Sequence, residues 1–181
     1  EDKALDLGWT PMDAFFYETD KQLWIQARTT RIDLNEYDLK KKHRQYFKNH
    51  IIGRYFQGSN PWQKECNIVF EKYCKYKNYD DHGSQLTNKE YGDKDYFVYF
   101  HDENIVAYTE LTRYQDSVVA GEFAWDYENP KLSLGTFAQN FECMSYKDMS
   151  YRYYYSSYAY QKVCEYKSHY NGFEWWTGRE W

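Results

Sequence analysis

Three runs of β-branched and aromatic residues follow one another with very little chain between them, and this pattern constrains the fold most. The runs are "YFVYFH" (96–101), "NIVAYTELTRY" (104–114) and "SVVAGEFAWDY" (117–127). Such residues favour strands, and the spacers His-Asp-Glu-Asn and Gln-Asp are short enough to be hairpin turns. The sequence therefore predicts three consecutive antiparallel strands.

Helices and further strands are predicted on both sides of this meander. Residues 21–34 and 151–157 read as strands, and 80–95 reads as a polar surface loop. Helices are predicted over 37–50, over 59–78, and over 136–148 with an apolar face of Phe137, Phe141 and Met144; a short helix or turn is predicted over 158–167. In the second helix, Asn60 is the expected N-cap and Pro61 the first helical residue. This order predicts an α+β fold, a mostly antiparallel sheet covered by helices.

The composition predicts one domain with an aromatic core. The chain has 181 residues, so we expect a single domain over 1–181. It contains 22 Tyr, 11 Phe and 7 Trp, so aromatic side chains must fill much of the interior. Buried Tyr and Trp need polar partners. We therefore expect hydroxyl groups at the edge of the core, or a cleft lined by aromatic rings.

Charge and cysteine pattern exclude several classes of protein. The net charge of −5 argues against a broad nucleic-acid surface but leaves room for a local basic patch. No apolar run approaches the roughly 20 residues of a membrane span, and no secretory signal is recognisable. The cysteines are scattered without a Cys-x-x-Cys pair, and no His, Asp or Glu group has metal-ligand spacing. These features predict a cytoplasmic protein with free thiols, no metal and no membrane contact.

The loop Ser133–Thr136 lies between the last strand of the meander and the next predicted helix. Its letters are Ser-Leu-Gly-Thr. Backbone amides at a helix start bind anions and polarised groups, and Gly135 would allow a ligand close approach. Ser133 or Thr136 could cap the helix. The alternative is that Gly135 only permits a turn.

Four stretches of the sequence carry a resemblance to a known family: "GWTPMDAFFYE", "RIDLNEYDLKKKHRQYFKN", "NPKLSLGTFAQNFE" and "YRYYYSSYAYQKVCEYKSHYNGFE". In this order, and over roughly half of the chain, they resemble the arginyl-tRNA–protein transferases, a family with the GNAT acyltransferase fold. "LSLGT" and the Tyr run followed by Tyr-Lys are the most specific. Ser156 and Ser157 stand where the family tends to have Leu-Gly.

The resemblance implies a GNAT-like fold and a set of donor-binding residues. It implies that Ser133, Leu134, Gly135 and Thr136 face the acyl-carrying end of the donor, whether that donor is aminoacyl-tRNA or coenzyme A. Lys167, from the Tyr-Lys match, joins the donor-binding set. The implied reaction is transfer of an aminoacyl group, arginyl in this family, to an amine of a protein or peptide without a separate cofactor.

Candidate bases come from the strand before the loop. Glu122 is expected on the same strand face as Val118, Ala120 and Ala124. A carboxylate on an apolar face either has a raised pKa, which suits a general base, or pairs with a neighbour such as Arg113. Asp126 is the alternative base.

Candidate donors of a proton or hydrogen bond come from the tyrosine run that follows residue 152. Its phenols could stabilise an oxyanion or a leaving group, and its rings could stack on a base. Tyr158, where the strand ends, is the residue that we single out. Most of the others are expected to fill the core.

A basic stretch is the candidate contact with nucleic acid. Lys40, Lys41, Lys42 and Arg44 could bind phosphates, or could form an ordinary solvated helix face. The side chain of His43, in the same stretch, is expected to pack inward.

Three functions remain open from the sequence. The first is aminoacyl transfer from tRNA to an amine, and the second is the same fold with an acyl-coenzyme A donor. Coenzyme A usually requires a longer glycine-rich loop than one with Gly135 alone. The third is a non-catalytic binding module. A basic strip leading to residues 133–136 favours tRNA, splayed strands favour coenzyme A, and a filled cleft favours neither.

Overall fold

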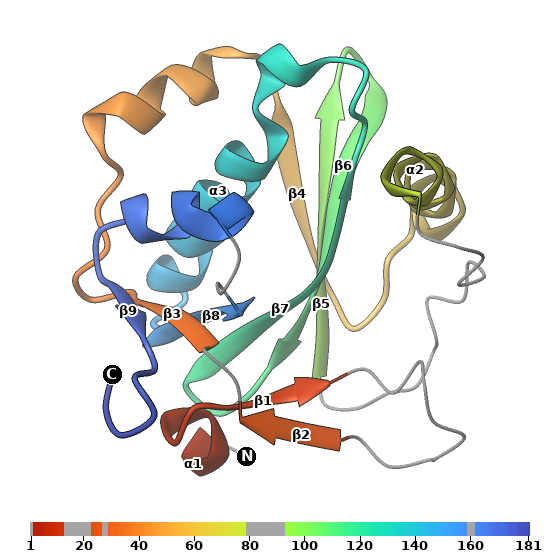
Figure 1. The fold of residues 1–181 in the computed structure, drawn as a ribbon. Coiled ribbons are helices and arrows are strands. Elements are labelled where there is room, and N and C mark those ends of the chain that lie inside the picture. Colours follow the sequence, from red (N-terminus) through yellow and green to blue (C-terminus); the bar gives the residue numbers. More distant parts are fainter. Residues whose placement is uncertain (1, 13–22, 27–28, 79–92, 159–161) are drawn as a thin grey trace.

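A seven-stranded sheet forms the centre of the computed structural model, which describes residues 2–12, 23–26, 29–78, 93–158 and 162–181 (Figure 1). The strand order is β4-β5-β6-β7-β8-β3-β9. The strands are β3 (Thr29–Asp33), β4 (Ile52–Gln57), β5 (Asp93–His101), β6 (Asn104–Arg113), β7 (Ser117–Trp125), β8 (Tyr153–Tyr158) and β9 (Phe173–Trp175). A second sheet pairs β1 (Trp9–Met12) with β2 (Leu23–Gln26), next to α1 (Asp2–Asp6).

The predicted meander is confirmed. β4, β5, β6 and β7 pair antiparallel in chain order. Asp102 and Glu103 form the β5–β6 turn with φ angles of 47° and 66°. Positive φ at both turn residues matches the right-handed twist of the flanking strands, which explains the tight hairpin.

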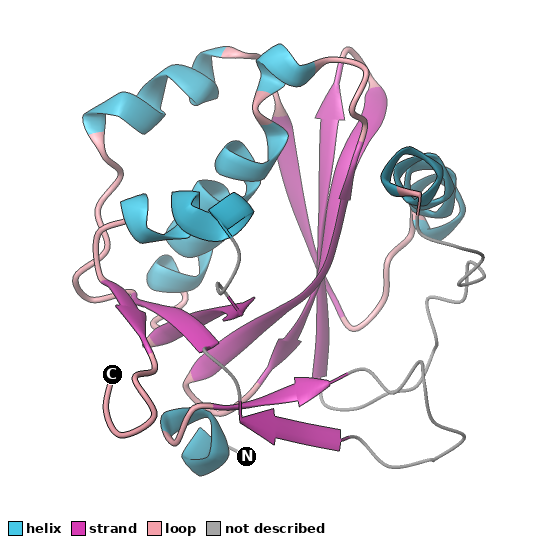
Figure 2. Ribbon diagram, in the orientation of Figure 1, coloured by secondary structure: helices cyan, strands magenta, loops and turns pink. Residues whose placement is uncertain are grey.

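Helices cover both faces of the sheet (Figure 2). α2 (Gln63–Lys77) packs on β6 and β7 from one side, as predicted. α3 (Leu134–Asp148), η1 (Lys41–Lys48) and η3 (Lys162–His169) lie on the other side, and η2 (Pro130–Leu132) precedes α3. The α+β prediction, a mostly antiparallel sheet flanked by helices, is therefore confirmed. The pair β7–β8 is parallel because α3 crosses over between these strands.

Several predicted boundaries are wrong. The predicted 37–50 helix is a 3₁₀ segment over Lys41–Lys48. The Asn60 side chain accepts a hydrogen bond from the Trp62 amide (2.9 Å), so it shapes a turn and α2 begins only at Gln63. The predicted 21–34 strand is divided into β2 and β3, and part of it lies outside the described residues, as does most of the 80–95 loop.

The core is aromatic, as predicted. On the α3 side it contains Phe97, Tyr99, Phe137 and Tyr146, which are at most 2% exposed. A smaller cluster under α2 includes Cys66, Val98 and Tyr108. Met144, which was expected on the apolar face of α3, is 37% exposed. Buried tyrosine hydroxyls reach carboxylates and carbonyls, and one group of them surrounds a single acid on α3.

Candidate active site

The parallel strands β7 and β8 pair over a short distance only. Their register covers Ser117–Val119 against Tyr153–Tyr155, although β7 continues to Trp125 and β8 to Tyr158. Beyond this register, β7 turns away with the meander while α3 lies alongside (Figure 1). The separation leaves room between the strands, next to α3.

A bulge in β7 lies next to this separation. Thr109 of β6 is opposite Phe123 and Leu111 is opposite Ala120, so Gly121 and Glu122 together face one residue of β6. An added Cβ at Gly121 would lie 3.1 Å from the Glu110 carbonyl oxygen, a tight contact that glycine avoids. The extra residue reverses the side-chain alternation of the strand.

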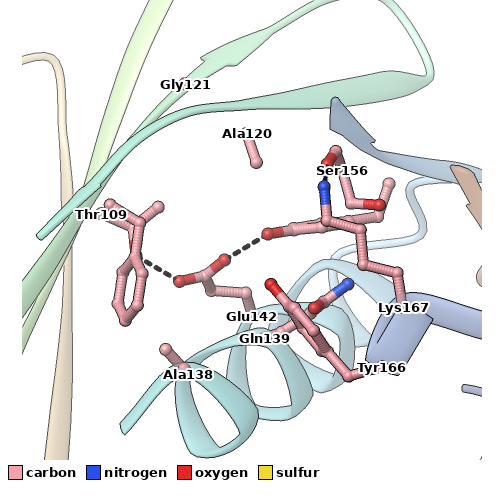
Figure 3. A pocket seen from close by; sticks show the side chains of 12 residues that line it. Thr109, Ala120, Gly121, Ala138, Gln139, Glu142, Ser156, Tyr166 and Lys167 are labelled. Atoms are coloured by element: carbon pink, nitrogen blue, oxygen red, sulfur yellow. Dashed lines mark hydrogen bonds between the residues drawn. The ribbon is translucent and has the colours of Figure 1, made fainter. Parts of the chain in front are cut away.

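A cavity of about 160 Å³ occupies the space between the separated strands (Figure 3). It is lined from β6 and β7 by Thr109, Ala120, Gly121 and Phe123, from α3 by Gly135, Ala138, Gln139 and Glu142, from β8 by Tyr154 and Ser156, and from η3 by Tyr166 and Lys167. The lining is apolar toward Phe123 and polar around α3. A cavity with a few convergent polar groups is the usual form of a small-ligand site.

Glu142 supplies the only carboxylate among the residues that line this cavity. It is 1% exposed. Its Oε1 accepts hydrogen bonds from the hydroxyls of Tyr99 (2.6 Å) and Thr109 (2.5 Å), and its Oε2 accepts one from Tyr154 (2.5 Å). Burial raises the pKa of Glu142 above its ordinary value, although the three hydroxyl donors act in the opposite direction.

Gln139 lies one turn before Glu142 on the same face of α3. Its side chain is buried, and its Nε2 has no hydrogen-bond partner in the described part of the chain. Figure 3 shows the amide directed into the cavity. A buried N–H group without a partner is costly, so this atom is available to a carbonyl oxygen of a ligand.

Two residues of the C-terminal part complete the wall. The Lys167 Nζ donates a hydrogen bond to the Ser156 carbonyl oxygen, which fixes η3 against β8. The Ser156 hydroxyl is hydrogen-bonded to that of Thr30 (2.9 Å). Lys167, expected to bind the donor, therefore lies at the cavity.

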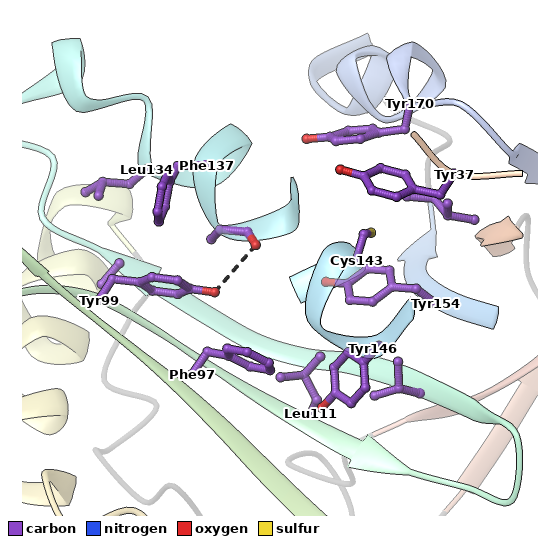
Figure 4. Close-up of a cluster of buried hydrophobic side chains, with 14 of the residues drawn as sticks. Tyr37, Phe97, Tyr99, Leu111, Leu134, Phe137, Cys143, Tyr146, Tyr154 and Tyr170 are labelled. Carbon is purple, nitrogen blue, oxygen red and sulfur yellow. Dashed lines mark hydrogen bonds between the residues drawn. The ribbon is translucent and has the colours of Figure 1, made fainter. Parts of the chain in front are cut away.

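Of the predicted donor loop, only Gly135 lines the cavity. Leu134 is 4% exposed and packs in the core beside Phe137 (Figure 4), so its side chain does not line this cavity. The donor-binding roles expected for Ser133, Leu134 and Thr136 stay predictions. Ser133 has a φ of 50° and ends η2, and no side-chain hydrogen bond caps α3. Ser133 is therefore the N-cap residue of α3 by position, but the expected side-chain cap from Ser133 or Thr136 is wrong. The helix begins at Leu134, two residues earlier than predicted.

The predicted bases lie away from the cavity lining. The bulge places Glu122 with Ala124 on the α2 side, so its expected position on one face with Val118 and Ala120 is wrong. Its Oε1 accepts a hydrogen bond from the Tyr108 hydroxyl (2.9 Å). Asp126 follows β7, and its Oδ1 accepts a hydrogen bond from the Glu128 amide (3.0 Å).

Tyr158 is the last residue of β8, the strand that supplies Tyr154 and Ser156 to the cavity. Its side chain lies outside what the structure describes. Its predicted role, like those of Glu122 and Asp126, stays a prediction.

The basic stretch lies next to the loop that precedes α3. Lys41, Lys42 and Arg44 are exposed on η1, and Lys40 is half-buried. The same segment ends at Asn49, whose Nδ2 donates to the carbonyl oxygens of Lys131 (3.3 Å) and Leu132 (3.2 Å). Basic residues therefore lie on a segment that leads to the start of α3.

His43 anchors that stretch. It is 5% exposed, and its Nδ1 is 3.2 Å from the Asn140 Oδ1. Burial lowers its pKa, which favours the neutral ring. The packing role predicted for His43 is confirmed.

The reasoning from sequence missed Glu142 and Gln139. One signal was present: Glu142 lies four residues after Ala138 and four before Tyr146, within the buried stripe of α3. An acid in such a stripe indicates a paired or functional carboxylate. The hydroxyls that surround it come from distant strands, and no local pattern reveals them.

Two further features are absent from the described residues. They contain no group of three or more His, Cys, Asp or Glu arranged to hold a metal ion. None of their helices has the length and apolar character needed to cross a membrane.

Solved structures with low sequence identity share the fold. The C-terminal domain of a protein named as a lysylphosphatidylglycerol synthetase from Agrobacterium fabrum matches with a TM-score of 0.60 at 13% identity, over 87% of this chain and 51% of that chain. FemX matches with a TM-score of 0.57 at 8% identity, over 89% and 60%. A GCN5-related glucosamine N-acetyltransferase region of a fungal multi-domain protein matches with a TM-score of 0.57 at 12% identity, over 93% and 20%.

These likenesses establish the fold and nothing finer. No protein-family model and no curated protein matches the sequence. The chain spans about half the length of the first of these structures. They agree with a GNAT-like fold and give no support for the narrower resemblance to arginyl-tRNA–protein transferases. The chain has a GNAT-like acyltransferase fold, with its cavity where the two parallel strands separate.

Proposed function

We propose that this protein transfers an acyl group to an amine and that the acyl group lies in the cavity between β7 and β8. The observation that carries this proposal is the buried Gln139 amide, whose Nε2 has no hydrogen-bond partner among the described residues and faces the cavity. In acyl transfer, negative charge develops on the carbonyl oxygen as the amine attacks. A preformed donor at that point stabilises the charge without reorganisation.

The steps of the reaction follow from this geometry. The neutral amine attacks the acyl carbonyl carbon, and a new C–N bond forms in a tetrahedral intermediate. The Gln139 Nε2 donates a hydrogen bond to its oxyanion. The intermediate collapses, the bond to the donor's oxygen or sulfur breaks, and the nitrogen loses its proton. Glu122, Asp126 and Tyr158 stay our proposals for groups that handle this proton.

We propose aminoacyl-tRNA as the donor and a protein or peptide amine as the acceptor. The basic residues Lys40, Lys41, Lys42 and Arg44 lie on a segment whose end contacts the loop before α3, as a tRNA donor requires. The name lysylphosphatidylglycerol synthetase also describes a product with a lysyl group, which is an aminoacyl group. A cytoplasmic location, where charged tRNA is found, belongs to the same proposal.

Coenzyme A is the second candidate donor. The separation of β7 from β8 favours it, since an extended thioester arm could enter there. Gly135 is the one glycine at the start of α3, and an added Cβ there would meet Phe123 at an ordinary 3.6 Å. The loop therefore shows no need for glycine to admit a pyrophosphate close to the backbone. For this reason we rank coenzyme A below aminoacyl-tRNA as the donor.

The test follows label from two donors into amines. The protein is incubated with tRNA charged with radiolabelled amino acids, or with labelled acetyl-coenzyme A, and with peptides that offer free amines. We expect transfer from charged tRNA, and a loss of about 10²-fold or more in Gln139→Met, which keeps the length but removes the donor. Absence of transfer from both donors would leave the binding-module alternative.

A further inference from the structure

The described part of the chain buries two carboxylates, and only one of them is paired with a basic side chain. Asp95 is 0% exposed, and its Oδ1 accepts a hydrogen bond from Nε of Arg113 (2.8 Å) in a salt bridge. Its Oδ2 accepts a hydrogen bond from the Tyr146 hydroxyl (2.9 Å). Glu142 is equally buried but forms no salt bridge with any described residue.

An unpaired buried carboxylate is unstable in its charged form. Burial removes water from the charge, and hydroxyl groups replace that water only in part. A carboxylate buried in the core is normally paired with a basic side chain, as Asp95 is with Arg113. Glu142 differs because it borders a cavity, where a ligand can supply the missing positive charge.

The carboxylate also retains an open acceptor position. An ionised carboxylate offers about four hydrogen-bond positions, two on each oxygen. Oε1 uses two of them for Tyr99 and Thr109, and Oε2 uses one for Tyr154. The described residues leave one position on Oε2 open, on the carboxylate that Figure 3 shows facing the cavity.

Gln139 presents the complementary feature one turn earlier. Within the described part of the chain, its Nε2 is a donor without a hydrogen-bond partner, whereas Oε2 of Glu142 is an acceptor with a spare position. An α-aminoacyl group carries an ammonium on its α-carbon and a carbonyl oxygen on the adjacent acyl carbon. Residues three apart on a helix are neighbours, so both can contact one such unit.

We propose that Glu142 makes the cavity selective for an α-aminoacyl group, with the α-ammonium bound to Oε2 of Glu142 and the acyl carbonyl oxygen bound to Nε2 of Gln139. This inference rests on the proposed function and names the class of acyl group. An acetyl group has no ammonium, so it would leave the charge of Glu142 uncompensated. Glu142 is thus a binding residue for the donor and not the base for the acceptor.

The first experiment measures discrimination at the α-position. The ligands are amide-linked 3′-aminoacyl analogues of adenosine that cover the common side chains, and for each binder a counterpart with an α-hydroxyl in place of the α-amino group. Binding to the full chain is measured by calorimetry. We expect the amino form of at least one side chain to bind tenfold or more tighter than its hydroxyl counterpart.

Two variants connect that discrimination to Glu142. In Glu142→Gln the ratio of the two affinities should fall close to one, because the amide has no charge for the ammonium. Asp95→Asn is the matched control: it neutralises the other buried carboxylate, which lies outside the cavity lining. Its melting temperature should fall while the affinity ratio is retained.

The outcomes separate this inference from the proposed function. Equal affinity for amino and hydroxyl forms, no binding of any analogue, or an unchanged ratio in Glu142→Gln would overturn the role of Glu142. Transfer from α-hydroxyacyl-tRNA as fast as from aminoacyl-tRNA would overturn it too, and would leave acyl transfer standing. Strong amino discrimination without any transfer would support the inference and remove the catalytic proposal.

Discussion

The hydroxyl of Tyr154 donates a 2.5 Å hydrogen bond to Oε2 of Glu142 and so joins β8 to α3 across the floor of the cavity. Tyr154 is 3% exposed, and burial raises its pKa well above the ordinary value. The phenol therefore stays protonated and acts as a donor. The contact fixes the one carboxylate oxygen that keeps an open acceptor position.

Removing this hydroxyl should loosen that arrangement. In Tyr154→Phe the ring still fills its place, but Glu142 loses one of three donors. We expect the free energy of unfolding to fall by about 1–3 kcal/mol, the usual cost for a hydrogen bond to a charged or buried acceptor. Urea denaturation measures this loss. Tyr99→Phe, which removes a donor from Oε1, should cost a similar amount, and no loss in either variant would contradict the hydrogen-bond network.

Glu142 should make the stability of the protein depend on pH. Its pKa is raised from the ordinary 4.5 in the folded state, so above that pH the folded chain binds more protons than the unfolded chain. The contribution of Glu142 to stability is then fully present below pH 4.5 and is lost as the pH rises through the raised pKa.

The variant Glu142→Gln cannot titrate, so it isolates this contribution. The free energy of unfolding of the variant, relative to that of the native protein, should increase as the pH rises above 4.5. Urea denaturation of both proteins at a series of pH values gives the difference. A difference that decreases with pH would mean that the native carboxylate is stabilised in its charged form.

Substitutions at Gly135 should distinguish an effect on ligand binding from an effect on stability. It lies in the first turn of α3, where an added Cβ would meet Phe123 at 3.6 Å. Gly135→Ala should therefore keep or raise stability by about 0.5–1 kcal/mol. Gly135→Val should weaken binding of the acyl donor because its branches extend toward the cavity. Thermal melting and calorimetry measure the two effects, and a large loss of stability with binding retained would favour the simple turn.

The basic segment should make tRNA binding depend on salt. If Lys40, Lys41, Lys42 and Arg44 contact phosphates, the logarithm of the affinity should fall linearly with the logarithm of salt concentration. Each neutralised residue should reduce that slope by about one unit. Neutralising Lys72 and Lys75, exposed on α2 at the other face of the sheet, should leave the slope unchanged. Equal effects from both faces would exclude a specific role for η1.

Glu122 and Glu142 can be compared directly in transfer assays. Glu122 faces α2 and accepts a hydrogen bond from Tyr108, whereas Glu142 borders the cavity. If Glu122 handles the amine proton, Glu122→Gln should lower turnover by about 10²–10⁴-fold with donor affinity unchanged, whereas Glu142→Gln should weaken binding of the aminoacyl donor. Unchanged turnover per folded molecule in Glu122→Gln would remove Glu122 from that role.

The sheet was predictable because its signal is local. Runs such as 104–114 alternate β-favouring residues between turn residues, so the meander and the covering helices follow from the sequence. The prediction of an α-helix over 37–50 was wrong because the apolar spacing of this segment also suits an α-helix. His43 and Tyr46 instead pack in a 3₁₀ segment, whose tertiary contacts override propensity.

The site was predictable only in part, for a physical reason. Gly135 and Lys167 were identified, and both line the cavity. Glu122 was assigned to the wrong face because one extra residue in β7 reverses the alternation. Gly121, a lone glycine inside a strand run, is compatible with such a bulge, but it does not fix where the alternation reverses. Glu142 depends on hydroxyls at Tyr99, Thr109 and Tyr154, which only the folded chain brings together.

The bulge at Gly121 and Glu122 divides β7 into two parts with opposite side-chain alternation. Before it, Val118 and Ala120 face the α3 side; after it, Phe123 faces that side and Ala124 faces α2. Deleting one residue here would exchange the environments of every later side chain in the strand, and Phe123 would leave the cavity wall. Point substitutions can reshape the cavity wall, whereas the length of β7 is fixed.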